Sequence, residues 1–226
     1  MTPDRARHIW QRNHPLGRAY ACTRRTLLLS ILALFGSCSI KMPVRPIDVA
    51  LPANKRLGLS VGYFVAPEMK SYETRIPVEG GNEVVFPVGA QSTSTFEAMF
   101  SKLFLRSGAL PARPSETSPA QDADAAIEPR LEGVSIKGPQ SGVSAEGWNV
   151  ALQYLFLFSD SAGHPIAYWH VGAVGHNTQG IIQDWIRQAS EAFGNAFLDL
   201  EQRFLDGFAK VPEVRAWLEA KGVSES

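Results

Sequence analysis

Hydrophobic residues alternate with small or polar residues in four stretches of the chain. A period of two places every second side chain on the same face of an extended segment, which is typical of a β-strand with one buried side. The predicted strands are Leu57–Val65, Ala123–Ile136, Glu146–Ser159 and Pro165–Val174. The third has the strongest pattern, with an apolar residue at every second position from Trp148 to Phe158. A shorter extended piece, Glu83–Val88, is expected at the edge of the sheet.

In two other stretches the hydrophobic spacing changes to three or four, the period of an amphipathic helix. The first, which begins near Phe96, predicts a helix that ends at Gly108. The second predicts a long helix from about Gln179 to Phe208, roughly 45 Å in length. Because that length exceeds the width of a small sheet, we expect a bend near Gly194 or an overhanging end. A short helix follows at Pro212–Ala220.

The order of these elements defines the expected fold class. A strand, a helix, three meandering strands and a long helix are typical of an α+β domain, because each helix has one apolar stripe to bury on a sheet. We therefore predict an antiparallel sheet of about four strands with two helices packed on one face. Residues 55–226 form this single domain, and the proline-containing segments Ala66–Asn82 and Pro111–Gln121 are its loops.

The third and fourth predicted strands also carry apolar residues at positions that the core pattern leaves pointing outward. The solvent-facing side of a sheet should carry few of them. Two interpretations are open: the loops fold over this face, or the face docks on a partner. The candidate binding face consists of Leu155, Leu157, Trp169 and Val171, with Tyr168 at its rim.

A short apolar run preceded by two arginines lies near the start of the chain. The run Thr26–Gly36 has eleven residues, too few for the roughly 20 that cross a bilayer as a helix. Basic residues followed by such a run and by small residues are typical of an export signal. The sequence Phe35–Gly36–Ser37–Cys38 resembles the lipobox of bacterial lipoproteins. This resemblance implies that residues 1–37 are a cleaved signal peptide and that Cys38 carries the lipid that anchors the protein to the membrane.

The same region bears on export and location. Arg24 and Arg25 resemble the twin-arginine export motif, and ordinary Sec signals contain such pairs as well, so both routes are open. Residues 38–54 contain three prolines and are expected to form a tether of up to about 50 Å. Among lipoproteins, an Asp directly after the lipidated cysteine implies retention in the inner membrane. Ser39 at that position implies the periplasmic face of the outer membrane.

The charge distribution argues against nucleic acid as a partner. The chain holds 22 basic and 22 acidic residues, of which six Arg and one Asp lie in residues 1–37, so 16 basic and 21 acidic residues remain after cleavage. A protein that binds nucleic acid needs a basic surface, which this excess of acid does not provide. Of the two cysteines, Cys22 lies in the signal, so the mature chain cannot form an internal disulfide.

Candidate catalytic and metal-binding residues lack the context that such sites need. His164, His170 and His176 are spaced by six residues, and such neighbours lie about 20 Å apart along a strand, too far to share a metal ion. No serine lies in a nucleophile elbow. The acidic residues of the long helix are interpreted as its solvent-exposed face: Glu191, Asp199, Glu201 and Asp206. We expect no enzyme, no metal and no cofactor.

The layout of the mature chain resembles two groups of lipoproteins from Gram-negative bacteria. The lipobox, the loop after the first strand and the closing pair of helices are similar to the uncharacterised YajG type and, more distantly, to LptE-like accessory lipoproteins. The resemblance implies a non-catalytic, lipid-anchored protein that binds or helps to assemble another envelope protein or lipid. The alternatives are a periplasmic carrier of a lipid or small apolar ligand, with an apolar cavity between the sheet and the long helix, and a hydrolase.

Overall fold

The computed structural model describes residues 39–47, 49–50, 56–78, 82–138, 147–177 and 185–223. All of them belong to one structural unit, Ser39–Ser226. The predicted signal peptide, residues 1–37, and the predicted lipidation site Cys38 lie outside the described residues. No helix in the described ranges is long and apolar enough to cross a membrane.

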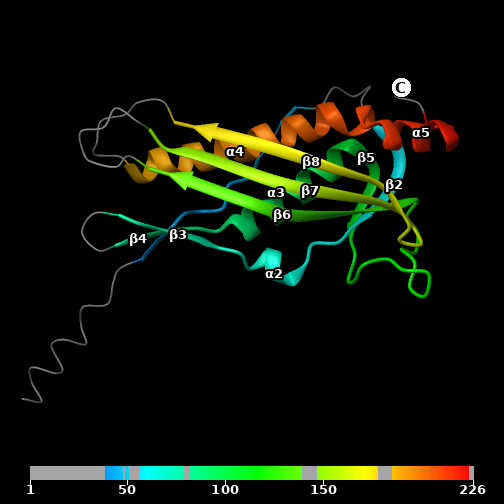
Figure 1. Ribbon diagram of the computed structural model, residues 1–226, viewed down its shortest axis with the longest axis horizontal. Coiled ribbons are helices and arrows are strands. Elements are labelled where there is room, and N and C mark those ends of the chain that lie inside the picture. The colour runs from blue at the N-terminus through cyan, green and yellow to red at the C-terminus, as the bar shows by residue number, and fades with distance from the viewer. Residues whose placement is uncertain are drawn as a thin grey trace, which may run out of the picture. The chain divides into compact units, whose positions relative to one another are not determined.

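A five-stranded mixed sheet with the strand order β5-β2-β6-β7-β8 forms the centre of the fold (Figure 1). Its strands are β2 (Leu57–Tyr63), β5 (Phe104–Ala109), β6 (Ala125–Lys137), β7 (Asn149–Asp160) and β8 (Pro165–His176). The strands β6, β7 and β8 form the predicted antiparallel meander. However, β2 runs parallel to both of its neighbours, so the prediction of a purely antiparallel sheet is wrong for this part.

A second sheet has three strands, in the order β1-β4-β3. Strand β1 (Ser39–Lys41) runs parallel to β4 (Glu83–Phe86), and β4 runs antiparallel to β3 (Thr74–Pro77). The strand predicted at Glu83–Val88 thus exists, but in a sheet of its own. The expected loop Ala66–Asn82 contains β3 and the short helix α2 (Pro67–Lys70).

The predicted tether is wrong at its beginning. Residues Ser39–Lys41 already belong to a sheet, and the side chains of Met42 and Ile47 are buried in the core. Prolines fix φ, but they do not prevent the apolar residues between them from packing against a domain. The described part of the domain therefore begins at Ser39 and not at residue 55.

Two long helices cover one face of the five-stranded sheet, as predicted, and the α+β class is confirmed (Figure 1). They are α3 (Val88–Leu103) and α4 (Trp185–Gly207), and α4 is followed by a 3-10 turn, Phe208–Lys210, and by α5 (Pro212–Ala220). Gly108 does not end α3, because the helix stops at Leu103 and the chain continues directly into β5. Helix α4 is continuous through Gly194.

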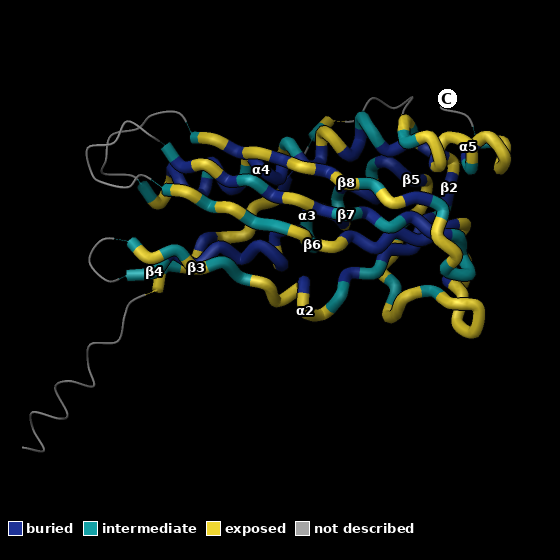
Figure 2. The backbone as a smooth tube through the Cα atoms, in the orientation of Figure 1, coloured by how far each residue is buried: buried dark blue, intermediate teal, exposed yellow. Residues whose placement is uncertain are grey.

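Aromatic side chains fill the space between the sheet and the helices. The ring centroid of Phe156 in β7 lies 4.7 Å from that of Phe204 in α4 and 5.6 Å from that of Phe96 in α3. Both helices therefore pack on the same face of the sheet. Helix α4 approaches β8 closely at Gly175, where an added Cβ would lie 2.1 Å from the carbonyl oxygen of Ala192. Figure 2 shows the buried positions along β7 and α3.

A buried ion pair also joins the two helices. Glu201 of α4 is fully buried, and its carboxylate accepts a hydrogen bond of 2.7 Å from Lys102 of α3. The interpretation of Glu201 as solvent-exposed is therefore wrong. Its neighbour Leu200 belongs to the buried stripe, and Glu201 reaches the second helix from the border of that stripe. Removing one partner of a buried pair is costly, so this contact fixes α3 against α4.

Candidate functional site

The structure divides the predicted binding face between the two sides of the sheet. The outer side, away from the helices, holds Leu155, Leu157 and Tyr168, and the inner side holds Trp169 and Val171. The register explains the division, because Phe156 pairs with Trp169 and Tyr154 pairs with Val171. Residues with even numbers in β7 thus share the core face with residues with odd numbers in β8. The prediction of one contiguous face is wrong for Trp169 and Val171.

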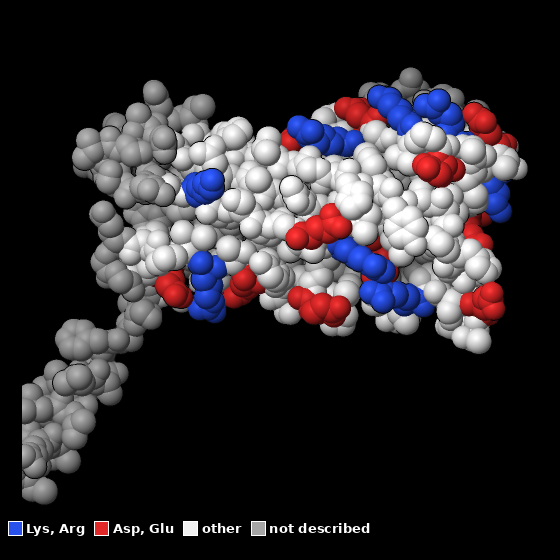
Figure 3. Space-filling view, viewed as in Figure 1, with Lys and Arg blue, Asp and Glu red and all other residues white. Residues whose placement is uncertain are grey.

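The outer side of β7 and β8 is partly open to solvent. Leu155 and Leu157 are half-buried, and Tyr168 is 60% exposed. The segment after β5 packs against the turn between the two strands, where the N–H of Ala120 donates to the carbonyl of Ser161. Figure 3 shows a largely uncharged surface over these strands. Docking of a partner on Leu155, Leu157 and Tyr168 therefore stays a prediction.

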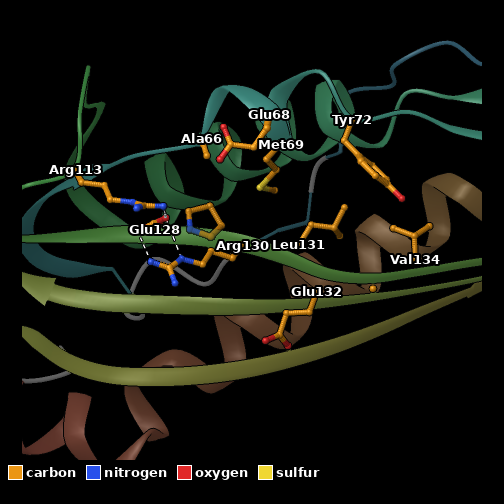
Figure 4. Close-up of a pocket in the computed structure, with 12 residues that line it drawn as sticks. Ala66, Glu68, Met69, Tyr72, Arg113, Glu128, Arg130, Leu131, Glu132 and Val134 are labelled. Carbon is orange, nitrogen blue, oxygen red and sulfur yellow. Dashed lines mark hydrogen bonds and ion pairs between the residues drawn. The ribbon is translucent and has the colours of Figure 1, made fainter.

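A pocket of about 450 Å³ lies between α2 and one edge of β6 (Figure 4). One wall is lined by Ala66, Met69 and Tyr72, and the other by Pro129, Leu131 and Val134. This volume is in the range of sites that bind ligands. The pocket is not predicted by the sequence, because residues 66–82 have the composition of a loop and no periodicity indicates that α2 lies against β6.

The edge of β6 along this pocket has no neighbouring strand in the described part of the chain. Strand β2 pairs with β6 only at Ala125–Ile127 and then leaves towards α2. The N–H of Phe64 donates to the carbonyl of Ile127, so the backbone groups of Ile127 face that side. Because these groups alternate between the two sides of an antiparallel strand, those of Pro129 and Leu131 face the pocket.

The position of Pro129 fits this geometry. A proline has no N–H and is tolerated in a strand where its nitrogen points away from the hydrogen-bonded neighbour. At Pro129 the nitrogen faces the pocket, so the pairing with β7 loses no hydrogen bond. The edge then offers the carbonyl of Pro129 and the N–H and carbonyl of Leu131, none of which bonds another described residue. The register shifts between Leu131 and Gly133, which ends the regular edge.

Two arginines surround a carboxylate at one end of the pocket. The side chain of Glu128 is only 7% exposed and accepts hydrogen bonds from Arg113 at 2.5 Å and from Arg130 at 3.0 and 3.1 Å. The hydrogen bond to Glu128 raises the pKa of Arg130, which keeps the guanidinium charged. Arg113 and Arg130 are the two cations of the pocket lining, which also holds the carboxylates of Glu68 and Glu132. Both guanidinium groups reach solvent, with side chains 55% and 43% exposed.

The chemistry of the pocket favours recognition over catalysis. Both oxygens of Glu128 are occupied by guanidinium groups, whereas a general base needs an oxygen free to accept a proton from substrate. Two other carboxylates line the pocket, Glu68 from α2 and Glu132 from β6. Glu132 is hydrogen-bonded to His170 at 2.9 Å on the outer side of the sheet. The remaining lining is mostly apolar.

The three histidines spaced by six residues each have hydrogen-bond partners of their own. The ring of His164 is hydrogen-bonded to Asp160 and Glu116, that of His170 to Glu132, and that of His176 to Asn149. The bonds to Asp160, and then to Glu116, raise the pKa of His164. Across the described ranges, no group of three or more His, Cys, Asp or Glu residues could hold a metal ion.

No protein-family model matches the chain, and no curated protein matches it. Solved structures do resemble it. A Xanthomonas campestris protein of the DUF330 family is 12% identical, with 80% of this chain and 99% of that chain covered and a TM-score of 0.45. An uncharacterised lipoprotein B of Nitrosomonas europaea is 12% identical over 73% and 94% of the two chains, with a TM-score of 0.40. A minor lipoprotein of Acinetobacter baumannii is 8% identical over 67% and 92%, with a TM-score of 0.38. These values describe a distant likeness of the chain path, and no function follows from them.

Proposed function

We propose that the protein is a lipid-anchored component of the bacterial cell envelope whose α+β domain binds another envelope component without catalysis. One observation carries the proposal: the arginines, the short apolar run and the small residues that precede Cys38 occur in the order that lipoprotein processing requires. Several acyl chains on Cys38, each worth about 0.8 kcal/mol per buried methylene, anchor the protein firmly. Ser39 after the cysteine supports a position on the periplasmic face of the outer membrane.

The start of β1 changes how such an anchor acts. Because β1 begins at Ser39 and consecutive Cα atoms lie about 3.8 Å apart, a single peptide unit separates a lipid on Cys38 from the three-stranded sheet. The domain is then held at the membrane surface and not on a long tether. Its partner is consequently a component within reach of that surface.

The described core offers no support for the alternative of a lipid carrier. A carrier needs an apolar cavity between the sheet and the long helix. In that space Phe193 lies 5.1 Å from Phe197, and Trp169 lies 5.3 Å from Phe204, measured between ring centroids. These rings are in contact with one another, as in a packed core.

The anchor is tested by replacing Cys38 with Ser in the full chain, expressed in a Gram-negative bacterium. We expect the variant to keep its precursor size, to leave the membrane fraction after washing at high salt and to incorporate no alkyne-labelled palmitate. The matched control is Cys22→Ser, which changes the other cysteine and should behave as wild type. A Cys38→Ser protein that has mature size and stays with the membranes contradicts the proposal.

The membrane is tested by a second substitution, Ser39→Asp, at an exposed position of β1. We expect wild type to sediment with the outer membrane in a sucrose gradient and the variant to move to the inner membrane. Equal distribution of both proteins contradicts the assignment to the outer membrane, whichever result Cys38→Ser gives.

A further inference from the structure

We propose that the pocket beside β6 binds an extended segment of a partner protein, which pairs with the free edge as an additional strand and directs an acidic side chain to Arg113 and Arg130. This inference rests on the proposed function as a binding protein and names the chemistry of what is bound. Three features of the pocket carry it: the backbone groups of the edge, the apolar walls and the two exposed guanidinium groups at one end.

The backbone groups favour a strand as the occupant. The carbonyl of Pro129 and the N–H and carbonyl of Leu131 face the pocket, and a buried or half-buried backbone group without a partner costs free energy. An added strand satisfies all three groups, which is the basis of peptide recognition by strand addition. The proline and the nearby bulge limit the pairing to a short segment, so the edge is protected against open-ended association.

The walls determine which side chains the segment carries. Met69 and Tyr72 lie across the pocket from Leu131 and Val134 (Figure 4). Successive side chains of a strand point to opposite faces, so only every second residue of the segment reaches these apolar groups. We therefore infer apolar residues at alternate positions.

The two arginines indicate that the segment also carries an acidic residue. Arg113 and Arg130 share the single carboxylate of Glu128, and their exposed nitrogen atoms can still donate to an anion. They lie around Glu128, at the end of the pocket away from Tyr72 and Val134 (Figure 4). An Asp or Glu next to the apolar positions of the segment can accept hydrogen bonds from these exposed guanidinium nitrogen atoms.

The test is a selection from a phage-displayed library of random nine-residue peptides. The target is the full-length protein in detergent micelles, with Ala66→Trp as the reference target, because a large side chain at Ala66 fills the pocket and leaves β6 unchanged. We expect peptides with apolar residues two apart and an adjacent Asp or Glu. They should bind wild type at least about tenfold more tightly than Ala66→Trp, a difference of about 1.4 kcal/mol.

The selected peptide is then used in a double-mutant cycle. We expect Arg113→Gln to weaken its binding about fivefold or more, and Asp→Asn in the peptide to do the same on wild type but not on the variant. Leu198→Ala, at an exposed position of α4 outside the pocket lining, is the matched control and should leave the affinity unchanged. Bound peptide should also protect the amide of Leu131 from hydrogen exchange. Melting temperatures show that each variant is folded.

Three results overturn the inference: no sequence enriched on wild type over Ala66→Trp, a motif with apolar spacing of three and four, which indicates a helix, or an exchange rate at Leu131 that the peptide does not change. None of them affects the fractionation of Cys38→Ser. The inference about the pocket and the proposal of a lipid anchor therefore fail separately.

Discussion

Trp169 of β8 lies directly across from Phe156 of β7, and their ring centroids are 6.1 Å apart on the core face of the sheet. Trp169 also contacts the rings of Phe204 and Phe208. The next residue towards the turn, Tyr168, points to the opposite side and is exposed. Two adjacent aromatic residues thus have different roles, and substitutions distinguish them.

We expect Trp169→Ala to lower the free energy of unfolding by about 3 kcal/mol, because it removes a large side chain from a packed cluster and leaves a cavity. Tyr168→Ala should change it by less than about 0.5 kcal/mol. Urea denaturation followed by circular dichroism measures both. Equal stability of the two variants contradicts the assignment of Trp169 to the core.

The buried hydroxyl groups of Ser92 and Tyr154 should respond unequally to removal. They lie 2.6 Å apart, and Ser92 donates its single hydroxyl proton to the carbonyl of Val88, so Tyr154 is the donor in their bond. Tyr154→Phe removes that donor and leaves Ser92 satisfied, so we expect a loss of about 1 kcal/mol. Ser92→Ala leaves the buried Tyr154 hydroxyl without its acceptor and should cost about 2 kcal/mol.

Thermal denaturation of the two variants, with the double variant as a control, tests this order. A larger loss for Tyr154→Phe than for Ser92→Ala would mean that the direction of the hydrogen bond is wrong. Burial also raises the pKa of Tyr154, so the buried phenol should not ionise until the protein unfolds in alkali.

Two glycines of α4 should respond to alanine with opposite signs. At Gly194 an added Cβ meets nothing within 4 Å, and alanine is the better helix former, so Gly194→Ala should stabilise the protein by about 0.5–1 kcal/mol. At Gly207 a Cβ would lie 2.7 Å from the ring of Trp169, so Gly207→Ala should destabilise it by about 1–3 kcal/mol. The shifts in melting temperature measure both, and a stabilising Gly207→Ala contradicts the close contact with Trp169.

The turn between β7 and β8 should contribute to stability over a limited pH range. Hydrogen bonds to Asp160 and Glu116 raise the pKa of His164 above 6.5, so this contribution is complete below pH 6.5 and is lost as the pH rises through the raised pKa. For Asp160, partial burial acts to raise the pKa, but the hydrogen bonds from His164 and Ala162 outweigh it and lower the pKa below 3.8. Its contribution is present above pH 3.8 and is lost as the pH falls through the lowered value.

The measurement is the difference in melting temperature between wild type and His164→Gln, followed from acid to alkaline pH. We expect the largest difference between about pH 4 and about pH 6.5, with a decrease on either side. A difference that increases with pH above 7 contradicts the ion pair.

The sequence predicted the elements in which the hydrophobic pattern repeats over enough residues to be distinct. The meander β6–β8 and helix α5 were found because strands of twelve or thirteen residues and a helix started by Pro212 have strong local patterns. The short strands β1, β3 and β5 were missed. Each has six residues or fewer, too few for a distinct hydrophobic period. Strands β1 and β5 also pair with segments distant along the chain, whereas β3 pairs with the nearby β4. Phe104 continues the apolar spacing of α3 and is also buried as the first residue of β5.

The candidate site could not be predicted for a related reason. It depends on where β2 leaves β6 and on which side the short helix α2 lies, and both are properties of the tertiary arrangement. One local sign exists: Pro129, between Glu128 and Arg130 inside a strand, indicates a position at an edge. Alternation within a strand shows which residues share a face, but it does not show which face that is. The prediction placed Trp169 on the outer face because only the register of the β7–β8 hairpin shows that Trp169 faces Phe156.

The parallel pairing of β1 with β4 also determines how the domain responds to mechanical force. A pull on Ser39 directed along β1 loads the hydrogen bonds to β4 in shear, so they resist together and do not open one after another. Met42, buried just behind the strand, adds its packing to that resistance. Under the proposed anchoring at Cys38, tension towards a bound partner acts directly on the pairing of β1 with β4.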